Sequence, residues 1–424
     1  MSSRSTIRLT CLAGFAVGSA LACGTANAEE LRWDYAKSYG AVAVTERSRR
    51  EFLSDGIRIG NFILRPEVGY GVTWSRNNAQ GLDLKISDFR HEINTRLELQ
   101  SATPRHMLTI LAQGRGVQYQ HSDEIHYVDG SIGSNWRIDI DHATSIFGGA
   151  SYAVRHLENV DDENPRGASR PGRTTSYGAE LGIRRQGHHI DAELGVRYQH
   201  FEFSDIPAND GSLIRLGWQD YSYVRPAATL AWRPSPGYRV FGEIAGSFQQ
   251  NVGNSVIDRD ATGMEASVGV QFELTPLVRV MLKGGFAQQD YHQANLVDIA
   301  EPVWEGRLEW LITPLVTMNL ATWRTIRATQ YGIASGQIVT GHSLKFDYEM
   351  WRNLVVSLEG SLRDLDYVGE SRNDRVVTAG IGFDYLYSKH WQLGARYEHQ
   401  ELVSSIDTYN TSLDRVKFNV TYRF

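Results

Sequence analysis

The sequence predicts an all-β protein: a transmembrane up-and-down antiparallel β-barrel of the outer-membrane type, with about 18 strands. Apolar and polar residues alternate with a period of two in many segments, each long enough to cross a bilayer when tilted. Very short connections between these segments alternate strictly with longer ones. The last segment ends on an aromatic residue, Phe424, inside the alternating pattern. A barrel whose final strand ends at a membrane interface explains all three observations.

Residues 1–28 are typical of a secretory signal peptide. Arg4 and Arg8 lie at the start of an apolar run rich in small residues, and Ala26-Asn27-Ala28 supplies a small-x-small cleavage pattern. The run is too short and too rich in Gly and Ala for a spanning helix. The alternative is a lipoprotein signal in which Cys23 is the lipidated residue.

The composition after cleavage at Ala28 narrows the possible chemistry. The cut removes Cys11 and Cys23, the only two cysteines, so the mature chain has no thiol for disulfide or thiolate chemistry. It also removes two arginines and no acidic residue, which moves the formal net charge from -6 to -8. Without a basic block, the sequence predicts no nucleic-acid partner. The 40 Gly, 20 Tyr, 15 Phe and 10 Trp suit curved strands and membrane interfaces.

Residues 29–60 carry many charges without sustained alternation, which predicts a periplasmic N-terminal arm of low order. The transmembrane barrel is expected over residues 61–424. Its short connections, expected in the periplasm, are 103–106, 141–144, 186–188, 234–237, 275–278, 313–316, 351–353 and 388–390. Its longer connections, expected outside the cell, are 75–85, 158–173, 205–219, 251–260, 292–300, 368–374 and 404–412.

Two other β architectures fit the sequence less well. A propeller blade would show four short strands and signature residues in each repeat of about 40 residues, where this chain has two long strands. A sandwich gives no reason for connection lengths to alternate.

One parity of each predicted strand is apolar, and the other is charged. The apolar parity, expected to face lipid, includes Val224, Ala228, Leu230, Leu308, Ile312, Leu344, Phe346, Met350, Ile381, Phe383, Tyr385, Leu393, Ala395 and Tyr397. Its aromatic members gather near the short connections as a girdle: Trp232, Trp310, Tyr348, Tyr387, Trp391, Tyr422 and Phe424. Desolvating an unpaired charge costs several kcal/mol, so the charged parity is expected to line a hydrated lumen. Between Met107 and His121 the two parities are not cleanly distinguished.

The stretch 46–78 carries a family resemblance. It has an Arg-rich arm, the element Gly56-Ile57-Arg58 with Gly60 and Phe62, and a first strand that begins near Pro66. This stretch resembles the opening of the beta-barrel porin 2 family, and the resemblance extends to Phe424. It implies an outer-membrane barrel of a Gram-negative bacterium, in some members encoded near exopolysaccharide export machinery. Phe424, with Tyr422, is similar to the C-terminal signal that the barrel-assembly machinery reads.

About eighteen strands enclose an aqueous channel, so the sequence predicts a porin-like channel for small hydrophilic solutes in the bacterial outer membrane. Rows of opposite charge across a constriction would orient dipolar solutes and reject apolar ones. The pore-lining candidates are Arg96, Glu98, Arg184, Glu193, Arg197, Glu309, Lys345, Glu349, Arg396 and Glu398. The alternative for each is that it merely pairs with another charge along the wall. One loop, 158–173 or 205–219, is expected to fold into the mouth or to form a site for an external partner.

Other functions are predicted less strongly. His189 and Asp191 share a parity, but His188 faces the other way beside a tight turn, so no metal site is predicted. The 13 His are scattered without a distinctive Ser context, so no catalytic residue or cofactor is predicted. An accessory role in polysaccharide export would need aromatic residues on the lumen parity, where Phe201 and Phe203 form a short run. A structural or adhesive barrel would have a blocked lumen and functional loops. The expected partners are outer-membrane lipid, the assembly machinery, and polysaccharide or small polar solutes.

Overall fold

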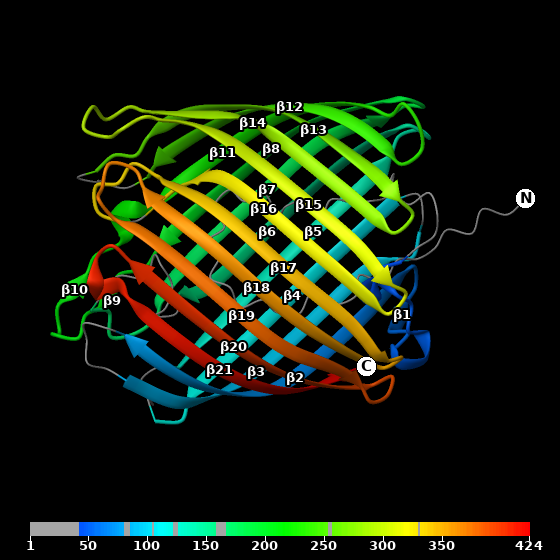
Figure 1. The fold of residues 1–424 in the computed structure, drawn as a ribbon, viewed down its shortest axis with the longest axis horizontal. Helices are drawn as coiled ribbons and strands as arrows, with labels where there is room; N and C mark the ends of the chain where they lie inside the picture. The colour runs from blue at the N-terminus through cyan, green and yellow to red at the C-terminus, as the bar shows by residue number, and fades with distance from the viewer. Residues whose placement is uncertain are drawn as a thin grey trace, which may run out of the picture.

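The protein is a closed antiparallel barrel whose strands are strongly tilted (Figure 1). The computed structural model describes residues 42–79, 85–103, 106–121, 126–157, 167–252, 257–329 and 331–424. The expected signal peptide and residues 29–41 of the expected arm lie outside the described residues. Every helix in the described part is a single 3-10 turn, and none is long and apolar enough to span a membrane.

Within these residues the main sheet has nineteen strands, of which β1 (Ile57–Ile59) is a short addition and eighteen form the wall. The wall strands are β2 (Phe62–Ala79), β3 (Lys85–Ser101), β4 (His106–Tyr119), β5 (His126–Asp139), β6 (Thr144–Leu157), β7 (Gly172–Gln186), β8 (Ile190–Phe203), β11 (Tyr221–Trp232), β12 (Tyr238–Asn251), β13 (Ala261–Thr275), β14 (Val278–Tyr291), β15 (Ile299–Thr313), β16 (Val316–Arg327), β17 (Gln337–Trp351), β18 (Leu354–Tyr367), β19 (Asn373–Leu386), β20 (Trp391–Ser404) and β21 (Thr411–Arg423).

The barrel closes because the last strand pairs with the first long one. The β2–β21 register runs from Glu67 opposite Arg423 to Ala79 opposite Thr411. The predicted fold class and strand number are therefore confirmed, and all eight predicted short connections fall between consecutive strands. The sequence-based reading missed two connections at the opposite end, between β4 and β5 and between β16 and β17. Gly114 and Gly116 help to explain the first, because residues without side chains blur the alternation along β4.

The outside of the barrel is apolar and its inside is charged, as the two parities predicted. Leu230 and Trp232 of β11 are 61% and 55% exposed, and Phe418 of β21 is 59% exposed. Residues of the opposite parity point inward. Lys417, which precedes Phe418 on β21, contacts Glu92 at 2.6 Å on the inner face of the barrel. A soluble protein would not expose apolar side chains over so large an area, whereas lipid covers them at no cost.

The described part of the N-terminal arm is ordered, which corrects the prediction of low order for residues 42–60. It forms two 3-10 turns, η2 (Val44–Glu46) and η3 (Arg50–Phe52), and then β1, which pairs with β2. The physical reason is that the arginines that suggested a solvated arm find partners on the barrel wall, as described below. Figure 1 places β1 at the same end of the barrel as the C-terminus, and the β9–β10 hairpin (Ile206–Pro207 and Leu213–Ile214) at the other.

Candidate functional site

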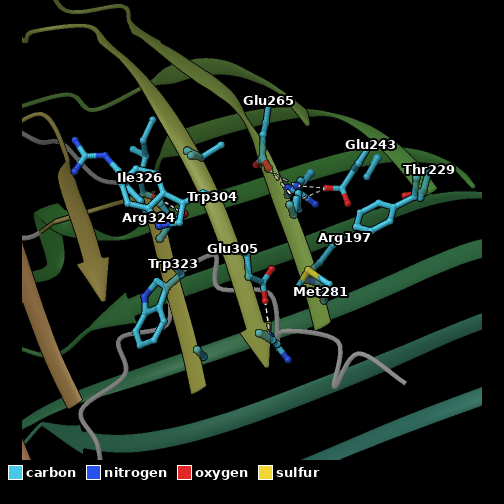
Figure 2. A pocket seen from close by; sticks show the side chains of 18 of the residues that line it. Arg197, Thr229, Glu243, Glu265, Met281, Trp304, Glu305, Trp323, Arg324 and Ile326 are labelled. Atoms are coloured by element: carbon cyan, nitrogen blue, oxygen red, sulfur yellow. Dashed lines mark hydrogen bonds and ion pairs between the residues drawn. The ribbon is translucent and has the colours of Figure 1, made fainter. Parts of the chain in front are cut away.

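The lumen contains a cavity of about 810 Å³. Strands β6 to β17 contribute its lining, and Figure 2 shows part of it. Phe147, Tyr223 and Trp323 add aromatic surface among the charges. Six acidic and six basic residues line it: Glu180, Glu193, Glu243, Glu265, Glu305, Glu309, Arg197, Arg225, Lys283, Arg307, Arg324 and Lys345. The cavity therefore has no excess of either charge among its lining residues.

Four of these side chains form one network on four consecutive strands. Arg225 of β11 contacts Glu243 of β12 at 2.8 Å and Glu265 of β13 at 3.3 Å. Lys283 of β14 contacts the same two carboxylates at 3.5 and 3.2 Å. All four side chains stay 18–27% exposed, so water and solutes in the lumen reach them. The network is an alternating row of charge across the wall, which is the arrangement that orients dipolar solutes.

Strands β15 and β16 bring further charge pairs to the cavity. Arg307 contacts Glu305 at 2.6 Å on β15. Arg324 of β16 contacts Glu301 of β15 at 2.9 Å and lies over the Trp304 ring at 5.6 Å. Figure 2 shows Trp304 and Arg324 gathered on one side of the cavity, with Glu243 and Glu265 on the other.

The structure brings four of the ten predicted pore-lining residues together at this cavity: Glu193, Arg197, Glu309 and Lys345. Each has a partner of opposite charge. Glu193 contacts Arg184 at 2.5 Å, Arg197 contacts Glu180 at 3.2 Å, Lys345 contacts Asp347 at 3.2 Å, and Glu309 contacts Arg279. Glu309 and Arg279 are both buried. All four charges therefore pair with other charges along the wall, which was the alternative to a free pore-lining role. Glu193, Arg197 and Lys345 nevertheless also reach the lumen.

The other candidates lie away from the cavity lining. Arg96 pairs with Glu98 at 2.9 Å on β3, Arg396 pairs with Glu359, and Glu398 pairs with Arg415 at 3.0 Å. Glu349 is covered by the N-terminal arm. The sequence-based candidates omitted Arg225, Glu243 and Lys283. The parity of their strands could have found them, since each lies opposite to apolar outward residues such as Val224 and Ile244.

Two alternative sites predicted from sequence do not have the required geometry. Phe201 and Phe203 are buried with Ile206, Leu216 and Tyr221 in a small core, so they offer no stacking platform to a sugar in the lumen. His189 Nδ1 donates to the Arg233 carbonyl at 3.0 Å, and Asp191 pairs with the Arg233 guanidinium. Across the described ranges, no group of His, Cys, Asp or Glu residues is arranged to hold a metal ion.

At the long-loop end of the barrel, several of the described connections contact one another and form a cap. The connection from β8 to β11 contains β9, β10 and the 3-10 turn η4 (Gly217–Gln219), and its core of Ile206 and Leu216 packs against Ala328 beyond β16. Four strands separate β11 from β16, so this connection reaches over the lumen. Ala328 also lines the cavity, so the cap borders the cavity at this residue. That loop 158–173 or 205–219 folds into the mouth stays a prediction; the contacts with Ala328 involve residues of the second loop, and residues 158–166 of the first lie outside the described residues.

Arg259 holds three parts of the cap together. Its side chain is 3% exposed, and its Nε and Nη2 donate to the carbonyls of Ala334 at 2.9 Å and Gly332 at 2.7 Å. Its guanidinium lies over the Trp218 ring at 5.5 Å. The connections β8–β11, β12–β13 and β16–β17 therefore meet at one residue. Nearby, Arg372 stacks on the rings of Tyr331, Tyr367 and Tyr409 at 3.7–4.4 Å.

Two cap carboxylates bind backbone N–H groups at strand ends. Asp220 accepts from Phe203 N at 2.7 Å, and Asp260 accepts from Asn251 N at 2.6 Å. Burial raises the pKa of both carboxyl groups above the usual range. A raised pKa means that the folded loops bind the proton more tightly than the unfolded chain does. Protonation of Asp220 and Asp260 as the pH falls therefore does not destabilise the cap.

A closed antiparallel barrel with an apolar outside and a charged lumen defines the class of outer-membrane channel proteins. Residues 51–424 match the family described as "Putative beta-barrel porin 2", and the chain belongs to this family. The expectations of an outer-membrane location in a Gram-negative bacterium and of a channel for small solutes are thereby confirmed. No curated protein matches the sequence.

Solved outer-membrane structures resemble the barrel at low sequence identity. Pseudomonas aeruginosa OccK1 (OpdK) is 10% identical with a TM-score of 0.45, over 85% of this chain and 98% of that chain. Pseudomonas aeruginosa OccK2 (OpdF) is 10% identical with a TM-score of 0.48, at the same coverage. Acinetobacter baumannii OccAB3 is 10% identical with a TM-score of 0.45, over 85% of this chain and 99% of that chain.

Proposed function

We propose that the protein is a passive diffusion channel for small polar solutes that carry both charges or no net charge. The observation that carries this proposal is the charge-balanced cavity, with six acidic and six basic lining residues. Opposite charges set side by side orient water and dipolar solutes, and their fields largely cancel for a simple ion at a distance. An apolar solute would have to displace this oriented water, so the passage of apolar solutes is disfavoured. The short-turn end lies in the periplasm, as in other outer-membrane barrels.

Within this proposal, Glu193, Arg197 and Lys345 line the path, and the network of Arg225, Glu243, Glu265 and Lys283 orients the solute. The cap of loops sets the outer width. A structural or adhesive barrel remains the competing function, because a cap that never opens would leave only the loops to act. Nothing in the site favours catalysis over passage.

Planar-bilayer recording of the refolded mature protein tests the channel. We expect discrete conductance steps and a permeability ratio of K⁺ to Cl⁻ within about threefold of unity, because the lining charges balance. Liposome swelling should be faster with a zwitterionic amino acid than with a dicarboxylate of similar size. Absence of steps in correctly refolded protein would favour the structural barrel. A strong preference for one ion would contradict the balanced lining.

The C-terminal aromatics form the proposed signal for the barrel-assembly machinery. Phe424 is exposed at the end of β21, and its ring meets Tyr422 at 4.9 Å, which in turn meets Trp391 at 4.9 Å. Phe424→Ala is expected to reduce the heat-modifiable, folded protein in outer-membrane fractions several-fold. Phe418→Ala is the matched control, because Phe418 is an exposed aromatic on the same strand. Equal loss in both variants would mean that Phe424 contributes only apolar surface.

A further inference from the structure

The N-terminal arm reaches the inner face of the barrel wall at the short-turn end. Ala43 and Val44 are 2% and 0% exposed, and Val44 N donates to Thr317 Oγ1 at 2.9 Å. Thr317 is a buried residue of the inward parity near the start of β16. The beginning of the described arm therefore lies inside the rim of the lumen and not on the outer surface.

Glu349 of β17 fixes this part of the arm. Its side chain is 4% exposed and contacts Arg49 at 3.0 Å, Arg47 at 3.4 Å and Arg352 at 3.7 Å. Arg49 is buried as well, and its guanidinium also donates to the carbonyls of Val44 and Arg352 at 2.9 and 3.1 Å. One carboxylate thus binds two arginines of the arm and one of the wall. Removing one partner of such a buried pair is strongly destabilising for the contact, because it leaves the other charge desolvated.

The rest of the arm follows the rim of the barrel. Arg352 binds Glu51 at 3.0 Å and the Ser48 carbonyl at 2.7 Å, and Ser54 donates to the carbonyl of Phe424. The arm then continues into β1, which pairs with β2. Four strands lie between β17 and β2, so residues 42–59 extend along the rim of the short-turn end from β17 to β2. In Figure 1 this blue segment lies at the same end as the C-terminus.

The barrel wall is complete without the arm in the region where Glu349 binds the arm. Strands β16 and β17 pair with each other from Val316 opposite Tyr348 to Arg327 opposite Gln337. At Thr317 and Glu349 the arm contacts inward side chains of the wall, where a channel would otherwise be open. We propose that residues 42–55 form the inner constriction of the channel, latched by Glu349, and that releasing the latch widens the pore. This proposal rests on the channel function and names the element that limits its periplasmic end.

A redox lock tests the proposal within a single folded protein. The mature chain has no cysteine, so a Val44→Cys/Thr317→Cys pair introduces its only two thiols at two residues that contact each other, and an oxidant or a short bismaleimide can join arm and wall. In a Glu349→Gln background we expect the reduced protein to conduct about 1.5- to 3-fold more than wild type, and oxidation to restore the wild-type conductance. Asp364→Asn is the matched control, because Asp364 pairs with the exposed Arg375 on the outer face.

The possible outcomes separate the constriction from the channel itself. Wild-type protein without conductance steps would contradict the channel function, whatever the arm does. Wild-type steps that stay unchanged in Glu349→Gln, and in a variant lacking residues 29–55, would overturn the constriction. Failure of the cysteine pair to be joined by either reagent, the flexible bismaleimide included, would place the arm away from the inner wall and overturn the constriction as well. Because the reduced and oxidised states share one refolded sample, a folding defect of the variant cannot imitate the expected reversal.

Discussion

Replacing Arg259 with alanine is expected to raise the single-channel conductance about twofold and to admit larger solutes. The buried guanidinium donates to two carbonyls of the β16–β17 connection and covers the Trp218 ring. Without it, the carbonyls of Gly332 and Ala334 lose a charged donor, at a cost of about 1–3 kcal/mol. The β8–β11 connection loses its anchor on the far side of the lumen. We expect the cap to open, and the change is measured in planar bilayers and by swelling with sugars of increasing size.

Arg259→Lys separates charge from geometry in this prediction. Lysine keeps the positive charge but cannot present the planar fork that reaches both carbonyls, so an intermediate conductance is expected. Arg375→Ala is the control, because Arg375 forms an exposed pair with Asp364 away from the cap. Limited proteolysis should cut the 204–220 connection faster in Arg259→Ala than in wild type. An unchanged conductance with faster proteolysis would mean that the cap opens but is not the narrowest point.

The barrel could be predicted from sequence because lipid and water impose a strict division on every strand. Trp391 and Leu393 had to share a parity with lipid-facing neighbours, and Arg396 had to take the other, since a charge in lipid is costly. Turn residues such as those at 234–237 marked one end of the wall independently of that division. The two signals agree along most of the chain, and strand number and direction follow from their agreement.

The site could be predicted only in part. Parity shows on which face of a strand a residue lies, but not its position along the barrel axis or the residues that it contacts. Arg225 and Glu265 are 40 positions apart and meet only through the register of β11, β12 and β13. Glu349 looked like another lumen charge, yet its partners Arg47 and Arg49 come from the other end of the chain. Phe201 and Phe203 had the lumen parity, but a loop core buries them. Contacts made by loops and termini leave no periodic trace in the sequence.

Removing one charge from the Arg225–Glu243–Glu265–Lys283 network is expected to make the channel selective, with a sign set by the residue removed. Lys283→Met leaves two carboxylates facing one arginine, so the reversal potential should shift toward cations. Glu265→Gln leaves two bases facing one carboxylate and should shift it toward anions. A unit charge about 4 Å from the ion path is worth about 1–4 kcal/mol, depending on local screening. We therefore expect a change of fivefold or more, by order of magnitude, in the permeability ratio.

Salt concentration and the double variant decide whether these shifts arise in the network. The Debye length is about 10 Å at 0.1 M salt and about 3 Å at 1 M, so both shifts should be large in dilute salt and nearly vanish in concentrated salt. Lys283→Met combined with Glu265→Gln restores the balance of charge and should return the ratio close to wild type. Shifts of the same sign, or no shift at 0.1 M, would show that ions avoid this wall. The opposite signs carry the argument, because a general loosening of the barrel would change conductance in both variants without reversing their preference.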